Sequence, residues 1–104
     1  MKVHSATAGT LESSDIFVHL EVDSIDELQS DIRIDLESAV IYQFGDQIRR
    51  VIESVLIEEG ITHVLVKAID RGALDCTITA RVRTAISRLK ASIHLDKQNE
   101  LVEG

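Results

Sequence analysis

The chain has 104 residues, enough for one modest hydrophobic core and too few for two domains. With 18 acidic and 11 basic residues its formal net charge is −7, which argues against nucleic-acid binding, because that function requires clustered Lys and Arg. No apolar run approaches the roughly 18 residues that cross a bilayer, and residues 1–11 lack the apolar region of a secretory signal, so we expect a cytoplasmic protein.

The N-terminal third of the chain predicts a leader and two strands. Residues 1–14 are small and polar, which is typical of an exposed, flexible leader that ends in a loop. Apolar and polar residues then alternate over 16–22 and again over 32–36, and each run predicts a half-buried strand. We expect these two strands to pair in antiparallel fashion.

The middle of the chain predicts a helix. Apolar residues recur at spacings of three and four over residues 41–56, with Ser38 as an N-terminal cap and Gly60 ending the helix in a left-handed conformation. Gly45 lies inside this helix at a cost of about 1 kcal/mol relative to Ala, and the sequence gives no reason for it.

The last third predicts a strand over 62–69, a turn over 70–72 and then an ambiguous segment. Residues 74–80 fit either a helix or a strand, and we favour the helix because the periodic run continues to Leu89. Together these elements predict an α+β fold in a single two-layer domain. Its three-stranded sheet carries two helices on one face, in the order β-β-α-β-α. The folded domain then spans residues 15–91, between the 1–14 leader and a polar C-terminal tail over 92–104.

No catalytic or metal site is evident from the residue types. The four histidines lie far apart in different elements, and Cys76, the only cysteine, is interpreted as a small core residue of the last helix. A single cysteine excludes an internal disulfide and suits a reducing compartment. Two serines, Ser13 and Ser14, end the leader, and their residue type alone favours ordinary loop positions.

Three blocks of the sequence resemble the acyl carrier chains of citrate lyase, also called gamma chains. The first is Ala8-Gly9-Thr10-Leu11-Glu12-Ser13-Ser14-Asp15, the second Gln43-Phe44-Gly45-Asp46-Gln47-Ile48-Arg49, and the third Asp70-Arg71-Gly72-Ala73-Leu74-Asp75-Cys76. Chain length and block order agree as well, so that the resemblance covers about residues 6–90.

The resemblance implies that this chain is a carrier subunit rather than an enzyme. The serine matching the family's attachment position is Ser13, which would hold phosphoribosyl-dephospho-CoA through a phosphodiester; at Ser14, relatives often have Gly. Glu12 and Asp15 would be recognised by the modifying enzyme. The arm's thiol would carry acetyl and citryl thioesters between the alpha subunit (acetyl:citrate transferase) and the beta subunit (citryl lyase). Further implied partners are the holo-carrier synthase, which attaches the arm, and citrate lyase ligase, which acetylates its thiol.

Three different functions stay open beside this one. Asp23-Ser24-Ile25 resembles the attachment signature of conventional phosphopantetheine carriers, although those are helical bundles and Ser24 here follows an alternating strand. The carrier of malonate decarboxylase uses the same arm in a different acyl cycle, but the spelling Gly-Thr-Leu-Glu-Ser favours citrate lyase. The third possibility is a non-catalytic interaction module without any prosthetic group.

Overall fold

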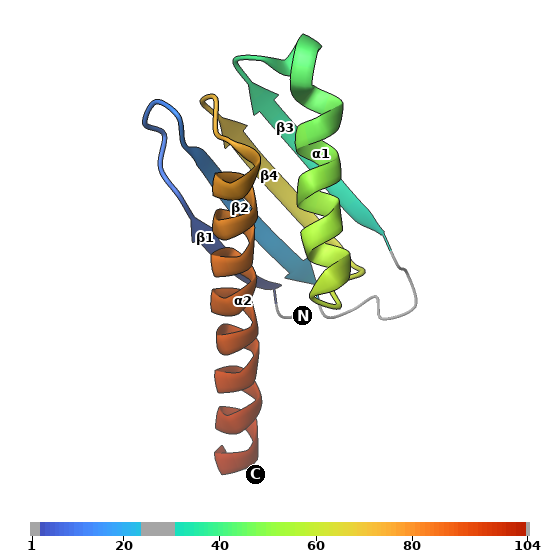
Figure 1. Ribbon diagram of the computed structural model, residues 1–104. Coiled ribbons are helices and arrows are strands. Elements are labelled where there is room, and N and C mark those ends of the chain that lie inside the picture. The colour runs from blue at the N-terminus through green and yellow to red at the C-terminus, as the bar shows by residue number, and fades with distance from the viewer. Residues whose placement is uncertain (1–2, 24–30, 104) are drawn as a thin grey trace.

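Four strands and two helices make up the fold in the computed structural model, which describes residues 3–23 and 31–103 (Figure 1). In chain order they are β1 (Val3–Ala8), β2 (Ile16–Asp23), β3 (Ile32–Ser38), α1 (Ile41–Glu58), β4 (Val64–Asp70) and α2 (Asp75–Glu103). Both helices lie on one face of the sheet, so that the predicted two-layer α+β architecture is confirmed.

The strands lie in the spatial order β1-β2-β4-β3, and β4 therefore separates β2 from β3. β2 pairs antiparallel with both β1 and β4, whereas β3 pairs parallel with β4. The expected antiparallel pair between residues 16–22 and 32–36 is thus wrong. The reason is the crossover through α1, which returns the chain to the start of β3 and makes the following strand parallel to it.

The prediction of a three-stranded sheet is also wrong, because β1 adds a fourth strand from within the expected leader. Its inward residues include Ala6 and Ala8, which are small, and its outward residues Ser5 and Thr7 are polar. Such a segment has little hydrophobic signal of its own. Pairing with β2 and packing against α2 hold it in the sheet.

The core fills the space between the sheet and the helices with aliphatic side chains. Its fully buried large side chains are Ile16, Val18, Leu20, Ile52, Leu56, Val66, Ile78, Val82, Ile86 and Leu89. They come from alternating positions of β2 and β4 and from one stripe of each helix; the sequence periodicity predicts this for β2 and for the helices. Cys76 is exposed, so its interpretation as a core residue is wrong.

The two ends of α1 differ from each other in how well the sequence predicts them. Gly60 has φ +78°, and the amides of Gly60 and Ile61 donate to Ile57 and Leu56, which confirms the predicted left-handed helix end. Ser38 is instead the last residue of β3, and its hydroxyl accepts the Val40 amide at 3.1 Å, before the helix begins. The predicted cap is therefore displaced into the connection that leads to α1.

Gly45 is buried inside α1, and the structure supplies the reason that the sequence lacks. A Cβ atom at this position would lie 3.1 Å from Ile41 Cδ1 and 3.4 Å from a guanidinium nitrogen of Arg49. Both side chains fold over the glycine, so a larger residue would force them outward.

The ambiguous segment over 74–80 is helical from Asp75, as favoured, and α2 continues far beyond its expected end. The residues predicted to form a polar tail, 92–104, are helical as far as Glu103, and this part projects past the sheet (Figure 1). Ile93 still packs against the core, and His4 Nε2 lies 2.6 Å from Asp96 Oδ2. Extending an existing helix requires no new nucleation, so polar residues continue it without a hydrophobic stripe.

Candidate functional site: the loop that carries Ser13

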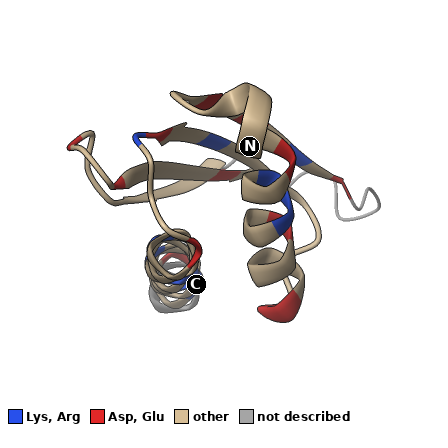
Figure 2. Cartoon of the chain, turned by 45° about the horizontal axis from the view of Figure 1, so that its top comes forward, with Lys and Arg blue, Asp and Glu red and all other residues tan. Residues whose placement is uncertain are grey.

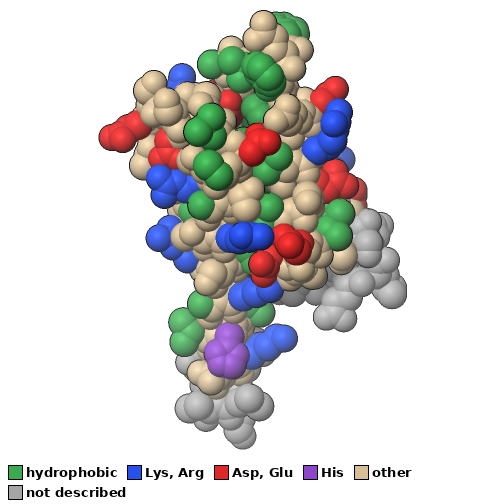
Figure 3. Space-filling model, in the orientation of Figure 1, with side chains coloured by type: hydrophobic (Ala, Val, Ile, Leu, Met, Phe, Trp, Pro, Cys, Tyr) green, Lys and Arg blue, Asp and Glu red, His purple; other side chains and the backbone are tan. Residues whose placement is uncertain are grey.

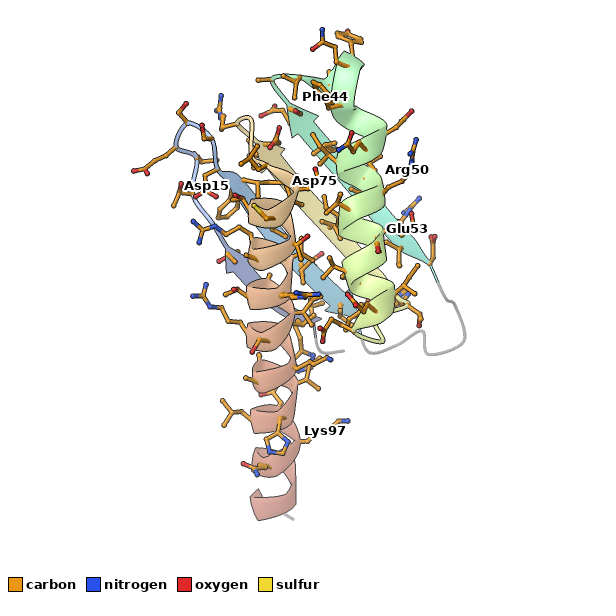
Figure 4. All side chains as sticks on the ribbon, in the orientation of Figure 1. Asp15, Phe44, Arg50, Glu53, Asp75 and Lys97 are labelled. Atoms are coloured by element: carbon orange, nitrogen blue, oxygen red, sulfur yellow. The ribbon has the colours of Figure 1, made fainter. Side chains whose placement is uncertain are left out.

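The loop over residues 9–15 joins β1 to β2 and lies beside the turn between β4 and α2 (Figures 1 and 4). Two backbone hydrogen bonds join the loop to the turn: the Ser14 amide donates to the Arg71 carbonyl, and the Arg71 amide donates to the Asp15 carbonyl, each at 2.9 Å. The first and third of the family-like blocks, far apart in the sequence, therefore meet at one end of the sheet.

The buried carboxylate of Asp15 holds this loop in place. Asp15 is 8% exposed, and its Oδ1 accepts hydrogen bonds from the Ile16 amide at 2.7 Å and from Arg81 Nε at 3.0 Å. Oδ2 accepts the Thr10 hydroxyl at 2.7 Å and Arg81 Nη2 at 2.9 Å. The Asp15 carboxylate thus ties the start of the loop, the start of β2 and helix α2 together.

The same contacts determine the charge of Asp15. Hydrogen bonds from Arg81 and then from Thr10 lower its pKa from 3.8 to about 2, against the opposing effect of burial. The carboxylate is therefore ionised at neutral pH, and its oxygens are already occupied by partners within the chain. These contacts make Asp15 a residue that holds the loop.

Gly9 allows the chain to enter the loop. It has φ +92°, and a Cβ atom built on it would lie 1.8 Å from the Ile16 carbonyl oxygen. Only glycine accommodates both the backbone conformation and this close approach. Beyond it, the Thr10 hydroxyl accepts the Glu12 amide at 3.1 Å, and the Asp15 amide donates to the Glu12 carbonyl at 3.2 Å. Hydrogen bonds within the loop thus lie on both sides of Ser13.

Ser13 and Ser14 are both exposed, but they play different parts in the loop. Ser14 has φ +66°, in the left-handed region that favours glycine, which agrees with the glycine that the resemblance leads us to expect there. Its amide is bound to Arg71, whereas the hydroxyl of Ser13 makes no hydrogen bond to any described residue. Ser13 therefore presents a free hydroxyl that another protein can approach.

No base lies in contact with the Ser13 hydroxyl among the described residues. A serine hydroxyl is a weak nucleophile without such a base, so its modification requires one supplied from outside the described chain. Throughout residues 3–23 and 31–103, no group of three or more His, Cys, Asp or Glu side chains is arranged to hold a metal ion. No described helix combines the length and apolar character needed to cross a bilayer.

A second buried carboxylate, Asp70, holds the neighbouring turn. Asp70 is 1% exposed; its Oδ2 accepts the Ser38 hydroxyl at 2.8 Å and its Oδ1 accepts the Ala73 amide at 3.0 Å. The sequence predicts only a turn here. Asp is a common residue in such turns, because its carboxylate can accept a nearby backbone amide. The residue type does not reveal the contact with Ser38.

An apolar groove lies next to this turn, between the beginnings of α1 and α2. It encloses about 400 Å³ and is lined by Val40, Phe44, Gln47, Ile48, Gly72, Ala73, Leu74 and Asp75. Phe44 is 48% exposed and Leu74 is 71% exposed; hydrophobic side chains gather at this end of the two helices in Figure 3. Apart from Val40, the lining residues belong to the second and third family-like blocks, which therefore supply both walls of the groove. Elsewhere along α1, acidic and basic residues are interspersed (Figure 2).

Comparison with known proteins gives matches over most of the chain. The malonate decarboxylase delta subunit family matches residues 3–89. The citrate lyase acyl carrier protein of Streptococcus uberis is 49% identical over 86 residues, covering 83% of this chain and 80% of that protein. The protein of the same name from Lacticaseibacillus casei is 53% identical over 85 residues, covering 82% and 79% respectively. That of Rhodopseudomonas palustris is 48% identical over 86 residues, covering 83% and 84%.

Among solved structures, a chain of a Pseudomonas malonate decarboxylase hetero-tetramer in complex with malonate has the same fold. The TM-score is 0.58 at 16% identity, and the match covers 86% of this chain and 99% of that one. This likeness concerns the fold alone, whereas the relatives with identities near 50% are matched over about four fifths of this chain. The chain belongs to the citrate lyase acyl carrier protein family.

Proposed function

We propose that this chain is the acyl carrier subunit of citrate lyase and that Ser13 bears the prosthetic group phosphoribosyl-dephospho-CoA through a phosphodiester. The observation that carries the proposal is the free, exposed Ser13 hydroxyl in a loop whose flanks are fixed by Asp15 and by Arg71. Ser14, by contrast, is held by its amide in a left-handed conformation, which favours a role in shaping the loop.

The surroundings of Ser13 fit a large, solvated prosthetic group. Ser13 is exposed, and the interior is filled by aliphatic side chains, so the group would extend away from the domain. When attached, it supplies a thiol on which acetyl and citryl units are carried as thioesters. The chain itself contributes the position of the attachment point and a high effective concentration of the tethered group.

This chain would hold no catalytic residue and would have four cytoplasmic partners. The alpha and beta subunits of citrate lyase would act on the tethered group, the holo-carrier synthase would attach it, and citrate lyase ligase would acetylate its thiol. Because β1 pairs with β2 in the same sheet, we place the start of the carrier domain at Val3 rather than at residue 15.

Reconstitution tests this function. Alpha and beta subunits of citrate lyase, prepared without their own carrier, should cleave citrate only after addition of this chain in its modified form. Ser13→Ala should give no activity, and the matched variant Ser14→Ala should keep most of it. Equal activity of Ser13→Ala and the unchanged chain would overturn the assignment.

A second candidate is the carrier of malonate decarboxylase. The family match and the shared fold favour it, although the relatives near 50% identity carry the citrate lyase name. Adding the same modified chain to malonate decarboxylase subunits that lack a carrier separates the two candidates. We expect no decarboxylation above background, and full activity there with none on citrate would reverse the choice.

A phosphopantetheine carrier and an interaction module would each give a distinct result when the chain is exposed to modifying enzymes. The phosphopantetheine carrier would be modified at Ser24, which lies outside the described residues. An interaction module without a prosthetic group would stay unmodified although the modifying enzymes are active.

A further inference from the structure

We propose that the guanidinium of Arg71 binds the phosphodiester that joins the prosthetic group to Ser13. This inference rests on the proposed attachment at Ser13. It assigns a ligand-binding role to a residue on the turn between β4 and α2, which is separated by 58 positions from the serine.

The backbone places Arg71 beside the attachment point. Its carbonyl accepts the amide of Ser14, and its own amide donates to the carbonyl of Asp15, both at 2.9 Å. These bonds hold Arg71 against the two residues that directly follow Ser13. The preceding residue, Asp70, is buried, whereas Arg71 is exposed, so its long side chain is open to solvent while its backbone is bound to the loop.

Arg71 is also the basic residue beside this loop whose side chain has no partner among the described residues. Arg81 is committed to the Asp15 carboxylate, and the Arg88 guanidinium donates to the Thr7 carbonyl at 2.8 Å. The Arg71 side chain makes no hydrogen bond or ion pair with any residue that the structure describes. An anion on Ser13 would therefore meet one uncommitted guanidinium in its vicinity.

The local charges favour such a partner. Glu12 is exposed and adjoins Ser13, so its carboxylate would repel a phosphate on the serine. The Asp15 charge is compensated by Arg81 and leaves no net attraction for a second anion. A guanidinium suits the role, because its planar donors match phosphate oxygens in a bidentate arrangement. Binding there would fix the first atoms of the prosthetic group and leave the rest free to move.

A phosphoserine placed at position 13 of the full-length chain tests the contact without any modifying enzyme. Its second pKa, near 6 in ordinary phosphoserine, falls when a cation stabilises the dianion, and phosphorus NMR follows the titration directly. We expect this pKa to be lower in the unchanged chain than in Arg71→Gln by about half a unit or more. Arg71→Lys should restore part of the difference.

The matched control is Arg50→Gln. Arg50 is an exposed arginine on α1, labelled in Figure 4, with no side-chain partner among the described residues. We expect it to leave the phosphoserine titration unchanged. Equal titration curves for the unchanged chain and Arg71→Gln, with both proteins folded, would overturn the inference, as would an equal shift in Arg50→Gln.

NMR of the modified chain provides a second test of the contact between Arg71 and the phosphodiester. After attachment has been located at Ser13 by mass, the Nε–H signal of Arg71 should shift relative to the unmodified chain, and that of Arg50 should stay in place. Modification at Ser13 without a shift at Arg71 contradicts the inference alone. Absence of modification at Ser13 contradicts the proposed function instead, and the phosphoserine titration would still report on the contact.

Discussion

The two turns that meet at this end of the sheet are built alike and expose different chemistry. Each is held by a buried carboxylate: Asp15 under the β1–β2 loop and Asp70 under the β4–α2 turn. The first presents the Ser13 hydroxyl, and the second presents the Arg71 guanidinium and the Leu74 side chain. The two buried aspartates thus support the loops from inside, while the residues available to other molecules lie at the tips.

The largest effect on this arrangement is expected from Gly9→Ala. The new Cβ atom would meet the Ile16 carbonyl oxygen, and the backbone would have to move, so we expect a loss of more than about 3 kcal/mol in the free energy of unfolding. Urea denaturation measures it.

Gly72→Ala in the neighbouring turn is the matched control. Gly72 has φ +91°, but nothing lies within 4 Å of its Cβ position, so its replacement should cost about 1 kcal/mol. Equal losses for the two variants would show that the close approach at Gly9 is unimportant.

Asp70→Ala should be the next most damaging change. It removes the acceptor of the Ser38 hydroxyl and of the Ala73 amide in a nearly inaccessible place, with an expected loss of about 3 kcal/mol. Ser38→Ala, which leaves the Ala73 bond intact, should cost about 1 kcal/mol. Thermal and urea unfolding of both variants would check the order, and a larger loss for Ser38→Ala would contradict it.

Asp15→Asn should cost somewhat less, about 2 kcal/mol at neutral pH, because it weakens the contacts with Arg81 and Thr10. The pKa of Asp15 is lowered on folding, so its contribution is fully present above its ordinary value of 3.8. It is lost as the pH falls through about 2. The stability difference between the unchanged chain and Asp15→Asn should therefore shrink between pH 4 and pH 2.

Arg81→Gln provides the control for this titration, because it removes the first cause of the lowered pKa. It should reproduce most of the loss at neutral pH and the same convergence in acid. A difference between the unchanged chain and Asp15→Asn that is independent of pH would contradict the assigned ion pair.

The smallest expected effect concerns the serine pair itself. Ser14→Gly relieves the left-handed conformation and should raise the free energy of unfolding by about 0.5 kcal/mol. Ser13 does not have a positive φ, so Ser13→Gly should lower stability by about 0.5 kcal/mol. Stability changes of the same sign in both variants would contradict the different roles assigned to the two serines. Ser14 shapes the loop, and Ser13 offers its hydroxyl for attachment.

The sequence predicts the parts of this fold that have strong periodicity. The alternation in β2 and β3 and the three-four spacing in α1 and α2 correspond to the inward-facing sides, and Gly60 ends α1 as its residue type indicates. β1 could not be predicted in this way, because Ala6 and Ala8 carry little hydrophobic signal and depend on β2 and α2 for their burial.

The site is predicted less completely than the fold. Resemblance to a family identifies the loop that carries Ser13, but the roles of Asp15 and Asp70 depend on partners 66 and 32 positions away, namely Arg81 and Ser38. No local pattern encodes a contact over such separations. The left-handed φ of Ser14 is likewise invisible from its residue type, since serine does not favour that conformation.

The most direct test of the central claim is to locate the prosthetic group. The full chain would be produced together with the holo-carrier synthase and the enzyme that makes its substrate, and its intact mass and peptide fragments would be measured. The account predicts the added mass of phosphoribosyl-dephospho-CoA on Ser13, absent from Ser13→Ala and retained by Ser14→Ala. An adduct on Ser14 or Ser24, or an unmodified chain beside a fully modified control carrier, would contradict it.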